Sequence, residues 1–288
     1  MGRTQTLRLC RGDSSVSAPA EQADDICALP LVRRMAALLD RDPAGFAEGD
    51  PLPRGWHVAL FNPPTPQSGL RADGAAHLGV TLPDLGMPRL MMGGRRIEFV
   101  GDIPIGARVR RTSRPGAVTI KEGKSGRFAL VDVEHRISLD TNDTPLLIET
   151  TSYVLRKEDG KGPTRVHPPT AAVIPPTDVS RTVTLDETVL FRYSAITDNP
   201  HRVHYDLSYA RSEGYPALVV NGTVPTMLLL EMFRAHVGGE PSGLHSRNLG
   251  QIFCGAPLTL TLSGEDGEWI MRAYGPGGEV ALDARAWG

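Results

Sequence analysis

The residues best suited to chemistry lie in one stretch, residues 191–206, which reads Phe-Arg-Tyr-Ser-Ala-Ile-Thr-Asp-Asn-Pro-His-Arg-Val-His-Tyr-Asp. It sets two histidines, His201 and His204, close to the amide of Asn199. An imidazole takes up and releases protons near neutral pH, so His204 is a candidate general base and Asn199 a candidate for orienting water. The alternative is structural: His204 is hydrogen-bonded in a turn, and Asn199 is the turn former of an Asp-Asn-Pro sequence.

A second candidate group follows in the segment Val-Val-Asn-Gly-Thr, residues 219–223, which opens an apolar helix expected over 224–237. A glycine at a helix start presents free backbone N–H groups and the positive end of the helix dipole. Such groups bind a carbonyl oxygen that gains negative charge during a reaction. Gly222 is therefore a candidate oxyanion donor, although a glycine that only serves a tight turn fits the same pattern.

The two histidines do not indicate a metal site. The glutamate of a His-Glu-x-x-His motif is absent, and no third ligand stands nearby in the sequence. We expect no metal and no other cofactor. Asp206 is better placed to cap a helix than to react.

The overall composition excludes several functional classes. The 288 residues are 40% apolar and 22% charged, which is typical of a globular protein. The 31 Lys and Arg residues against 33 Asp and Glu residues leave a net charge of −2, so no basic excess favours nucleic acid or an anionic membrane surface. The apolar runs are also far shorter than the roughly 20 residues of a membrane helix.

The cysteines and the N-terminus predict a cytoplasmic protein. Charged residues interrupt the first apolar residues, as they would not in a signal peptide. An odd, sparse set of cysteines without CxxC spacing indicates a reducing compartment. These are Cys10, Cys27 and Cys254.

The chain divides into four expected segments. Residues 1–23 are small and polar and form a tail, and residues 158–176 are a linker rich in Pro and Gly. Between and after them lie two domains, 24–157 and 177–288, each with a helical part followed by antiparallel strands, which makes the class α+β. The proline-rich residues 50–94 are expected to be a functional loop or linker. Apolar residues at helical spacing predict a helix from about Ala28 to Asp42. Strands are expected at 96–100, 108–112, 117–121, 127–135, 146–155, 247–263, 267–274 and 279–286.

The stretch 191–223 resembles the hydratase motif of the MaoC-like enoyl-thioester hydratases and dehydratases. It is most similar to the subgroup of type 2 hydroxyacyl-thioester dehydratases and itaconyl-CoA or mesaconyl-C4-CoA hydratases. Within that subgroup's pattern the chain matches Tyr193, Ser194, Ala195, Thr197, Asn199, His201, Arg202, His204, Tyr205 and Asp206. Motifs of the first half, among them Asp73-Gly74, Met87-Pro-Arg89 and 93–99, are similar to the same subgroup. Asn199 stands where the family at large has an acidic residue, in agreement with the subgroup. Three residues depart from the subgroup's pattern: Asn221 stands where a histidine is usual, and Met91-Met92 replace aromatic and basic residues.

The resemblance implies a double hotdog fold, in which two halves each wrap an antiparallel sheet around a helix. It assigns catalysis to His204, Asn199 and Gly222 in the C-terminal half, and acyl binding to the N-terminal half. It implies an acyl-CoA substrate, most directly itaconyl-CoA or mesaconyl-C4-CoA hydrated to citramalyl-CoA, and leaves a homodimer open. Dehydration of a 3-hydroxyacyl thioester and non-catalytic acyl-CoA binding are the alternatives. The implied substrate-binding residues are Tyr193, Ser194, His201, Arg202, Asn221, Arg89, Met92 and Arg95, with Arg96 a further candidate for a substrate carboxylate or a CoA phosphate.

Overall fold

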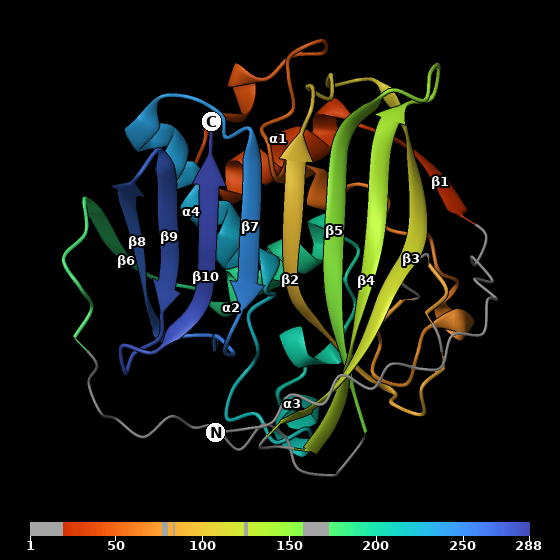
Figure 1. The fold of residues 1–288 in the computed structure, drawn as a ribbon, viewed down its shortest axis with the longest axis vertical. Helices are drawn as coiled ribbons and strands as arrows, with labels where there is room; N and C mark the ends of the chain where they lie inside the picture. Colours follow the sequence, from red (N-terminus) through yellow and green to blue (C-terminus); the bar gives the residue numbers. More distant parts are fainter. Residues whose placement is uncertain (1–19, 77–79, 83, 124–125, 158–172) are drawn as a thin grey trace.

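The computed structural model describes residues 20–76, 80–82, 84–123, 126–157 and 173–288. Its central feature is one antiparallel sheet of ten strands, in the order β1-β3-β4-β5-β2-β7-β10-β9-β8-β6 (Figure 1). The first five strands in this order come from the N-terminal half of the chain and the last five from the C-terminal half. The N-terminal strands are β1 (Glu21–Ile26), β2 (Arg89–Phe99), β3 (Arg108–Gly123), β4 (Gly126–Leu139) and β5 (Pro145–Arg156). The C-terminal strands are β6 (Val179–Thr184), β7 (Gly243–Asn248), β8 (Pro257–Glu265), β9 (Glu268–Tyr274) and β10 (Val280–Trp287).

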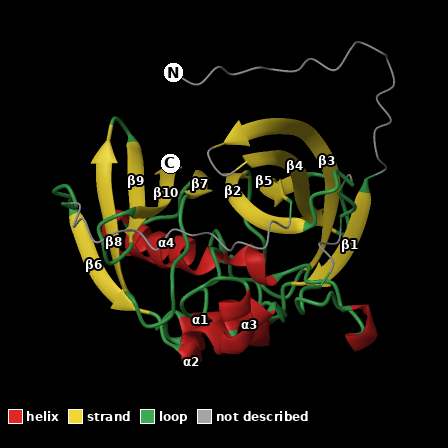
Figure 2. Ribbon diagram, turned by 90° about the horizontal axis from the view of Figure 1, so that it is seen from below, coloured by secondary structure: helices red, strands yellow, loops and turns green. Residues whose placement is uncertain are grey.

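The C-terminal half of the sheet curves around α4 (Thr223–Val237), the helix expected at 224–237 (Figure 2). Residues on most sides of this helix are buried, including Met227, Leu230 and Phe233. They pack on the inward residues of β8 and β9, such as Leu260 and Met271. Burial of a side chain of this size contributes roughly 1.5–3 kcal/mol. An apolar core therefore fixes the position of the α4 N-terminus.

The N-terminal half is built differently. Its expected helix is α1 (Leu29–Leu38), which begins with Pro30 in the first turn and buries Val32, Met35 and Ala36. The helix ends where Asp40 takes a left-handed conformation with φ of 56°. It packs against α2 (Glu187–Ile196), and loops occupy most of the inner side of the curved strands β1 to β5 (Figure 2).

Five shorter elements complete the described part of the chain. The helix α3 (Leu207–Ser212) follows a single 3₁₀ turn, η4 (Arg202–His204). Three further 3₁₀ turns lie in the N-terminal half, at Pro43–Gly45 (η1), Trp56–Ala59 (η2) and Gln67–Gly69 (η3).

The structure differs from the sequence expectation in four places. The strands expected at 247–263 are β7, which begins earlier at Gly243 and ends at Asn248, and β8, which begins only at Pro257. β1 begins at Glu21, inside the expected tail, because its alternating side chains pair with β3. β2 begins at Arg89, inside the proline-rich segment, since Pro88 ends the run of prolines. The strands expected at 108–112 and 117–121 are one strand, β3, with a break in register between Pro115 and Val118. Most of the expected linker lies outside the described residues.

Among the described residues, no helix is long and apolar enough to cross a membrane.

The two halves are joined by β2 and β7, which pair from Gly94 opposite Arg247 to Glu98 opposite Gly243. Gly94 is required there by close approach: a Cβ at this position would lie 2.2 Å from the Ser246 backbone oxygen.

We predict that Gly94→Ala destabilises the protein by about 1–3 kcal/mol, because the neighbouring strand backbone cannot yield without breaking the pairing. Thermal unfolding measures the loss. The matched control is Gly45→Ala, where a Cβ meets no atom within 4 Å. It should change stability by no more than about 0.5 kcal/mol. Equal melting temperatures for the two variants would contradict this account of the junction.

Candidate active site

A cleft of about 1420 Å³ opens between the two halves of the protein. The N-terminal half contributes the inward face of β2 to β5 and residues of the loops 57–63 and 71–76. The C-terminal half contributes Tyr193, residues 197–201, 203–204 and 219–223, among others. The two stretches singled out in the sequence therefore meet on one wall of a single cleft.

His204 closes η4 and is 8% exposed. Its Nδ1 lies 2.7 Å from the backbone oxygen of Val219. A carbonyl oxygen can only accept a hydrogen bond, so Nδ1 carries the proton of the neutral imidazole. The lone pair is then on Nε2, and the side chain lines the cleft as a base of fixed tautomer.

Asn199 is placed by the end of α2. Asp198 adopts a left-handed conformation with φ of 44°, which an aspartate tolerates, and this turns the chain back on the helix. The backbone N–H of Asn199 then donates to the backbone oxygen of Ser194 at 2.9 Å, and the side-chain Oδ1 of Asn199 accepts from the backbone N–H of His201 at 3.3 Å. Its Nδ2 makes no hydrogen bond to the described residues, so this amide lines the cleft with donors to offer.

Gly222 is the N-cap residue of α4 and also lines the cleft. The neighbouring Thr223 N–H is already satisfied, because it donates to Asn221 Oδ1 at 3.1 Å, as does the Thr223 hydroxyl at 2.6 Å. The buried Tyr193 hydroxyl extends this chain to Thr223. The Gly222 N–H has no acceptor among the described residues. An unsatisfied N–H at the positive end of a buried helix fits a developing oxyanion.

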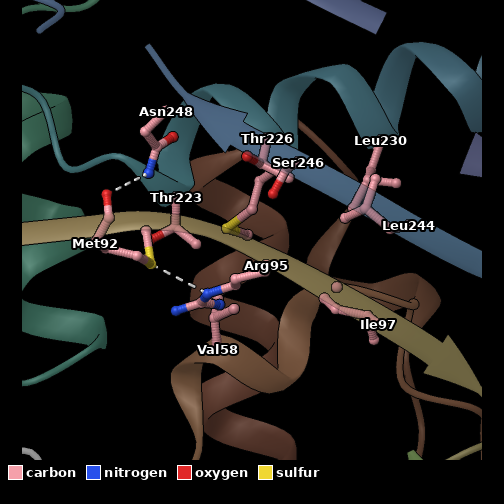
Figure 3. Close-up of a pocket in the computed structure, with 12 residues that line it drawn as sticks. Val58, Met92, Arg95, Ile97, Thr223, Thr226, Leu230, Leu244, Ser246 and Asn248 are labelled. Carbon is pink, nitrogen blue, oxygen red and sulfur yellow. Dashed lines mark hydrogen bonds between the residues drawn. The ribbon is translucent and has the colours of Figure 1, made fainter. Parts of the chain in front are cut away.

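Residues of the N-terminal half hold this helix end in place. Asn248 Nδ2 donates to the Met92 oxygen at 3.1 Å, and a Cβ on Gly222 would lie 3.2 Å from that nitrogen. Figure 3 shows Met92 and Arg95 of β2 beside Thr223 of α4. A second contact joins the halves at the cleft, where the backbone N–H of Arg202 donates to the backbone oxygen of Asp73 at 2.8 Å.

His201 stands next to the proposed base. Its ring meets that of His204 edge to face, with centroids 5.6 Å apart, and its Nε2 lies 3.9 Å from Asp73 Oδ2. Burial and the neighbouring His204 lower the pKa of His201 to about 4. It is therefore neutral at physiological pH. The described residues contain no group of three or more His, Cys, Asp or Glu side chains arranged to hold a metal ion.

The remaining candidate residues divide into two groups. Arg89 and Arg95 line the cleft: Arg89 hydrogen-bonds the Tyr215 hydroxyl at 3.1 Å, and Arg95 pairs with Glu149 at 3.3 Å. Arg202 instead pairs with Asp206 at 2.7 Å and stacks on Tyr209. Three candidates are not among the residues that line the cleft: Arg202, Ser194 and Arg96.

The cleft also contains polar residues that the sequence analysis missed. They lie on the inward face of the N-terminal strands, at positions that share the two-residue period of buried neighbours such as Val133 and Ile137. A charged residue at such a position is the signal that could have found them. They are Arg111, His135, Glu149 and Tyr153, together with His57.

A known protein family matches most of the chain. Residues 55–254 match the family described as hydroxyacyl-thioester dehydratase type 2. The chain belongs to this family. It is an enzyme of the hydratase and dehydratase class that acts on acyl thioesters, as the resemblance in its motif implied.

Two curated relatives support the membership. Mesaconyl-C(4)-CoA hydratase of Chloroflexus aurantiacus is 38% identical over 266 residues, which cover 91% of this chain and 92% of the relative. The mitochondrial hydroxyacyl-thioester dehydratase type 2 of Schizosaccharomyces pombe is 34% identical over 88 residues, 29% of each protein.

Solved structures confirm the fold. A MaoC-like dehydratase from Phytophthora capsici matches with a TM-score of 0.69 at 15% identity, over 94% of this chain and 95% of that one. A Mycobacterium tuberculosis protein described as having a double hotdog fold matches with a TM-score of 0.54 at 13% identity, over 93% of this chain and 95% of that one. The dehydratase-family chain is thus an α+β double hotdog.

The environment of His204 predicts a pH profile. Burial lowers the pKa of His204 below its ordinary value of 6.5, and the hydrogen bond to Val219 offsets only part of this. A general base works when neutral, so a lowered pKa keeps it active to lower pH. We expect kcat/KM for hydration to be level above pH 6.5 and to fall only below it. A limb centred above pH 7 would contradict His204 as the base.

Proposed function

We propose that the protein hydrates the double bond of an enoyl-CoA, with mesaconyl-C4-CoA or itaconyl-CoA converted to citramalyl-CoA. The observation that carries the proposal is the placement of His204, a buried base of fixed tautomer, in the same cleft as the unsatisfied Gly222 N–H. Identity of 38% to a mesaconyl-C(4)-CoA hydratase supports the choice of acyl group.

The proposed mechanism uses three groups of the chain. The thioester carbonyl oxygen accepts from the Gly222 N–H, and a water is held between Asn199 and His204. In mesaconyl-C4-CoA the double bond is conjugated with the thioester: His204 Nε2 takes a proton as the water oxygen adds to the β-carbon, and the electrons of the double bond move onto the carbonyl as an enolate. Itaconyl-CoA has its double bond between the β- and γ-carbons, so it enters this route only after a proton moves from its α-carbon to its γ-carbon. The enolate is stabilised at the helix end, and His204 returns the proton to the α-carbon. An asparagine cannot accept a full proton, so His204 carries the acid–base work.

The cleft supports a thioester substrate of substantial size. Its volume of about 1420 Å³ exceeds the roughly 300–1,000 Å³ that holds a drug-sized ligand. An acyl group together with part of the CoA arm fits such a space. Of the four arginines that the sequence analysis named, Arg89 and Arg95 line this cleft. Either could form a bidentate, charge-assisted pair with a carboxylate of the substrate.

Dehydration of a 3-hydroxyacyl thioester is the second candidate function. It is favoured by Met92, whose methyl group would lie 3.6 Å from a Cβ on Gly222 and so places apolar surface next to the proposed thioester position. A longer hydrophobic acyl chain would pack against that surface.

A substrate panel tests the proposal. We expect kcat/KM for mesaconyl-C4-CoA and itaconyl-CoA to exceed that for crotonyl-CoA and a C8 enoyl-CoA by about 10- to 100-fold, because an ionic hydrogen bond contributes about 1.5–3 kcal/mol. Loss of enoyl absorbance and a mass gain of one water measure turnover. Preference for crotonyl-CoA or the C8 substrate would favour the second candidate, and no turnover of any substrate would refute both.

Substitutions at the proposed base and its neighbour test the mechanism. His204→Ala should retain less than a tenth of wild-type turnover, since a general base contributes about 10²–10⁴-fold. Asn199→Ala should lose roughly 10-fold by losing a hydrogen bond to water, whereas Asn199→Asp should retain activity on crotonyl-CoA. Wild-type rates in Asn199→Ala would show that this residue serves only the turn.

A further inference from the structure

The inward face of the N-terminal sheet carries charged side chains where a protein interior is usually apolar. Arg95 on β2, Glu149 on β5, His135 on β4 and Arg111 on β3 share this face, because the strand registers place Ile97 opposite Glu149 and Glu149 opposite His135. All four line the cleft. Burying polar groups costs free energy unless they are paired. The question is therefore which of them are paired within the protein.

Glu149 is fully paired. It is 5% exposed and lies 2.8 Å from His57 Nε2, 2.6 Å from the Thr151 hydroxyl and 3.3 Å from Arg95 Nε. His135 is also paired, to the Ser113 hydroxyl at 2.8 Å. Burial lowers its pKa to about 4, so it adds no charge to the group.

The two arginines are different. Arg111 Nε is buried without a hydrogen-bond partner, and no carboxylate of the described residues lies within 4.0 Å of this guanidinium. Instead, its Cζ atom lies over the ring of Phe61, 5.2 Å from the ring centroid. The nearby carboxylate of Asp25 is occupied by the backbone N–H groups of Ile26 and Phe61.

Arg95 has its Nε engaged and its other donors free. Glu149 and Met92 Sδ both lie within 3.3 Å of that Nε. The Nη groups make no hydrogen bond to the described residues. Glu149, held by His57 and Thr151, thus acts as a positioning residue that fixes the direction of the Arg95 fork. Figure 3 shows this arginine beside Thr223, one residue from the proposed oxyanion donor.

We propose that Arg111 and Arg95 form a receptor for a carboxylate carried by the acyl group of the substrate. The inference rests on the proposed function for the position of the thioester, and it makes the N-terminal half the part that selects charged acyl groups. Both guanidinium groups line one cleft, and among the described residues Glu149 is the only carboxylate within 4.0 Å of either, so positive charge is left for an anionic oxygen pair.

Binding of saturated thioesters tests the receptor without requiring catalysis. Methylsuccinyl-C4-CoA and isovaleryl-CoA have acyl groups with the same carbon skeleton, but only the first has a free carboxylate. We expect calorimetry on the wild-type protein to show about 10- to 100-fold tighter binding of methylsuccinyl-C4-CoA, and Arg111→Gln to remove most of this ratio. Equal binding by the wild type, or an equal loss for both thioesters in the variant, would overturn the proposal.

Two further variants control the result. Arg111→Lys keeps the charge but not the fork, so it should reduce the ratio less than Arg111→Gln does, and it serves if Arg111→Gln does not fold. Arg110→Gln alters the neighbouring residue, whose side chain pairs with Asp24 on the opposite face, and should leave the ratio unchanged. An unchanged ratio in Arg111→Lys, or a ratio lost in Arg110→Gln, would count against the receptor.

Turnover of mesaconyl-C4-CoA and 3-methylcrotonyl-CoA separates this inference from the proposed function. Absence of turnover with an intact binding ratio would refute the hydratase proposal and keep the receptor. Turnover with equal binding of the two saturated thioesters would keep the hydratase proposal and refute the receptor.

Discussion

The pairing of β2 with β7 is the interaction on which the site depends. His204, Asn199 and Gly222 all belong to the C-terminal half, and α4 buries its apolar side chains against that half of the sheet. The other wall of the cleft belongs to the N-terminal half and is placed opposite these residues because β2 continues the sheet at β7. The close approach at Gly94 and the Asn248 to Met92 hydrogen bond set the spacing. A shift of one residue in this register would turn the Arg95 side chain to the other face of the sheet.

The two halves share an architecture but differ in what fills it. In the C-terminal half, α4 fills the curve of the sheet with Leu, Met and Phe side chains, which fixes the helix N-terminus rigidly. In the N-terminal half, the inner face ends in a paired carboxylate, Glu149, and in arginines that face a cleft. Burial of polar groups is costly unless they are paired, and Glu149 is paired. Under the proposed function, the N-terminal half supplies the space and charge for a substrate in addition to its own apolar core.

Much of the fold followed from periodicity. The 3.6-residue pattern placed α1 and α4, and the two-residue alternation placed β4, β5, β9 and β10 closely, because each signal is local. The start of β2 and all of β1 did not follow, since both depend on partners far away in the chain. The site was predicted unevenly for the same reason. Its C-terminal wall is a contiguous motif, whereas Arg111, His135 and Glu149 sit on three strands and converge only when the sheet curves. Their alternation with buried residues was visible, but charged strand residues usually face water.

The identity of residue 199 connects the base to the proposed substrate. His204 is oriented by a backbone oxygen, which fixes the tautomer without adding a charge. In the proposed mechanism an asparagine at 199 likewise holds a water without adding a charge. A carboxylate there would help to remove a proton, but it would also stand near the β-carbon, to which the second carboxylate of mesaconyl-C4-CoA is attached. Like charges held close together in a poorly solvated cleft repel strongly. Under the proposed function, an uncharged amide beside His204 suits an anionic enoyl thioester better than a further carboxylate would, which gives Asn199 a chemical reason to differ from an acid.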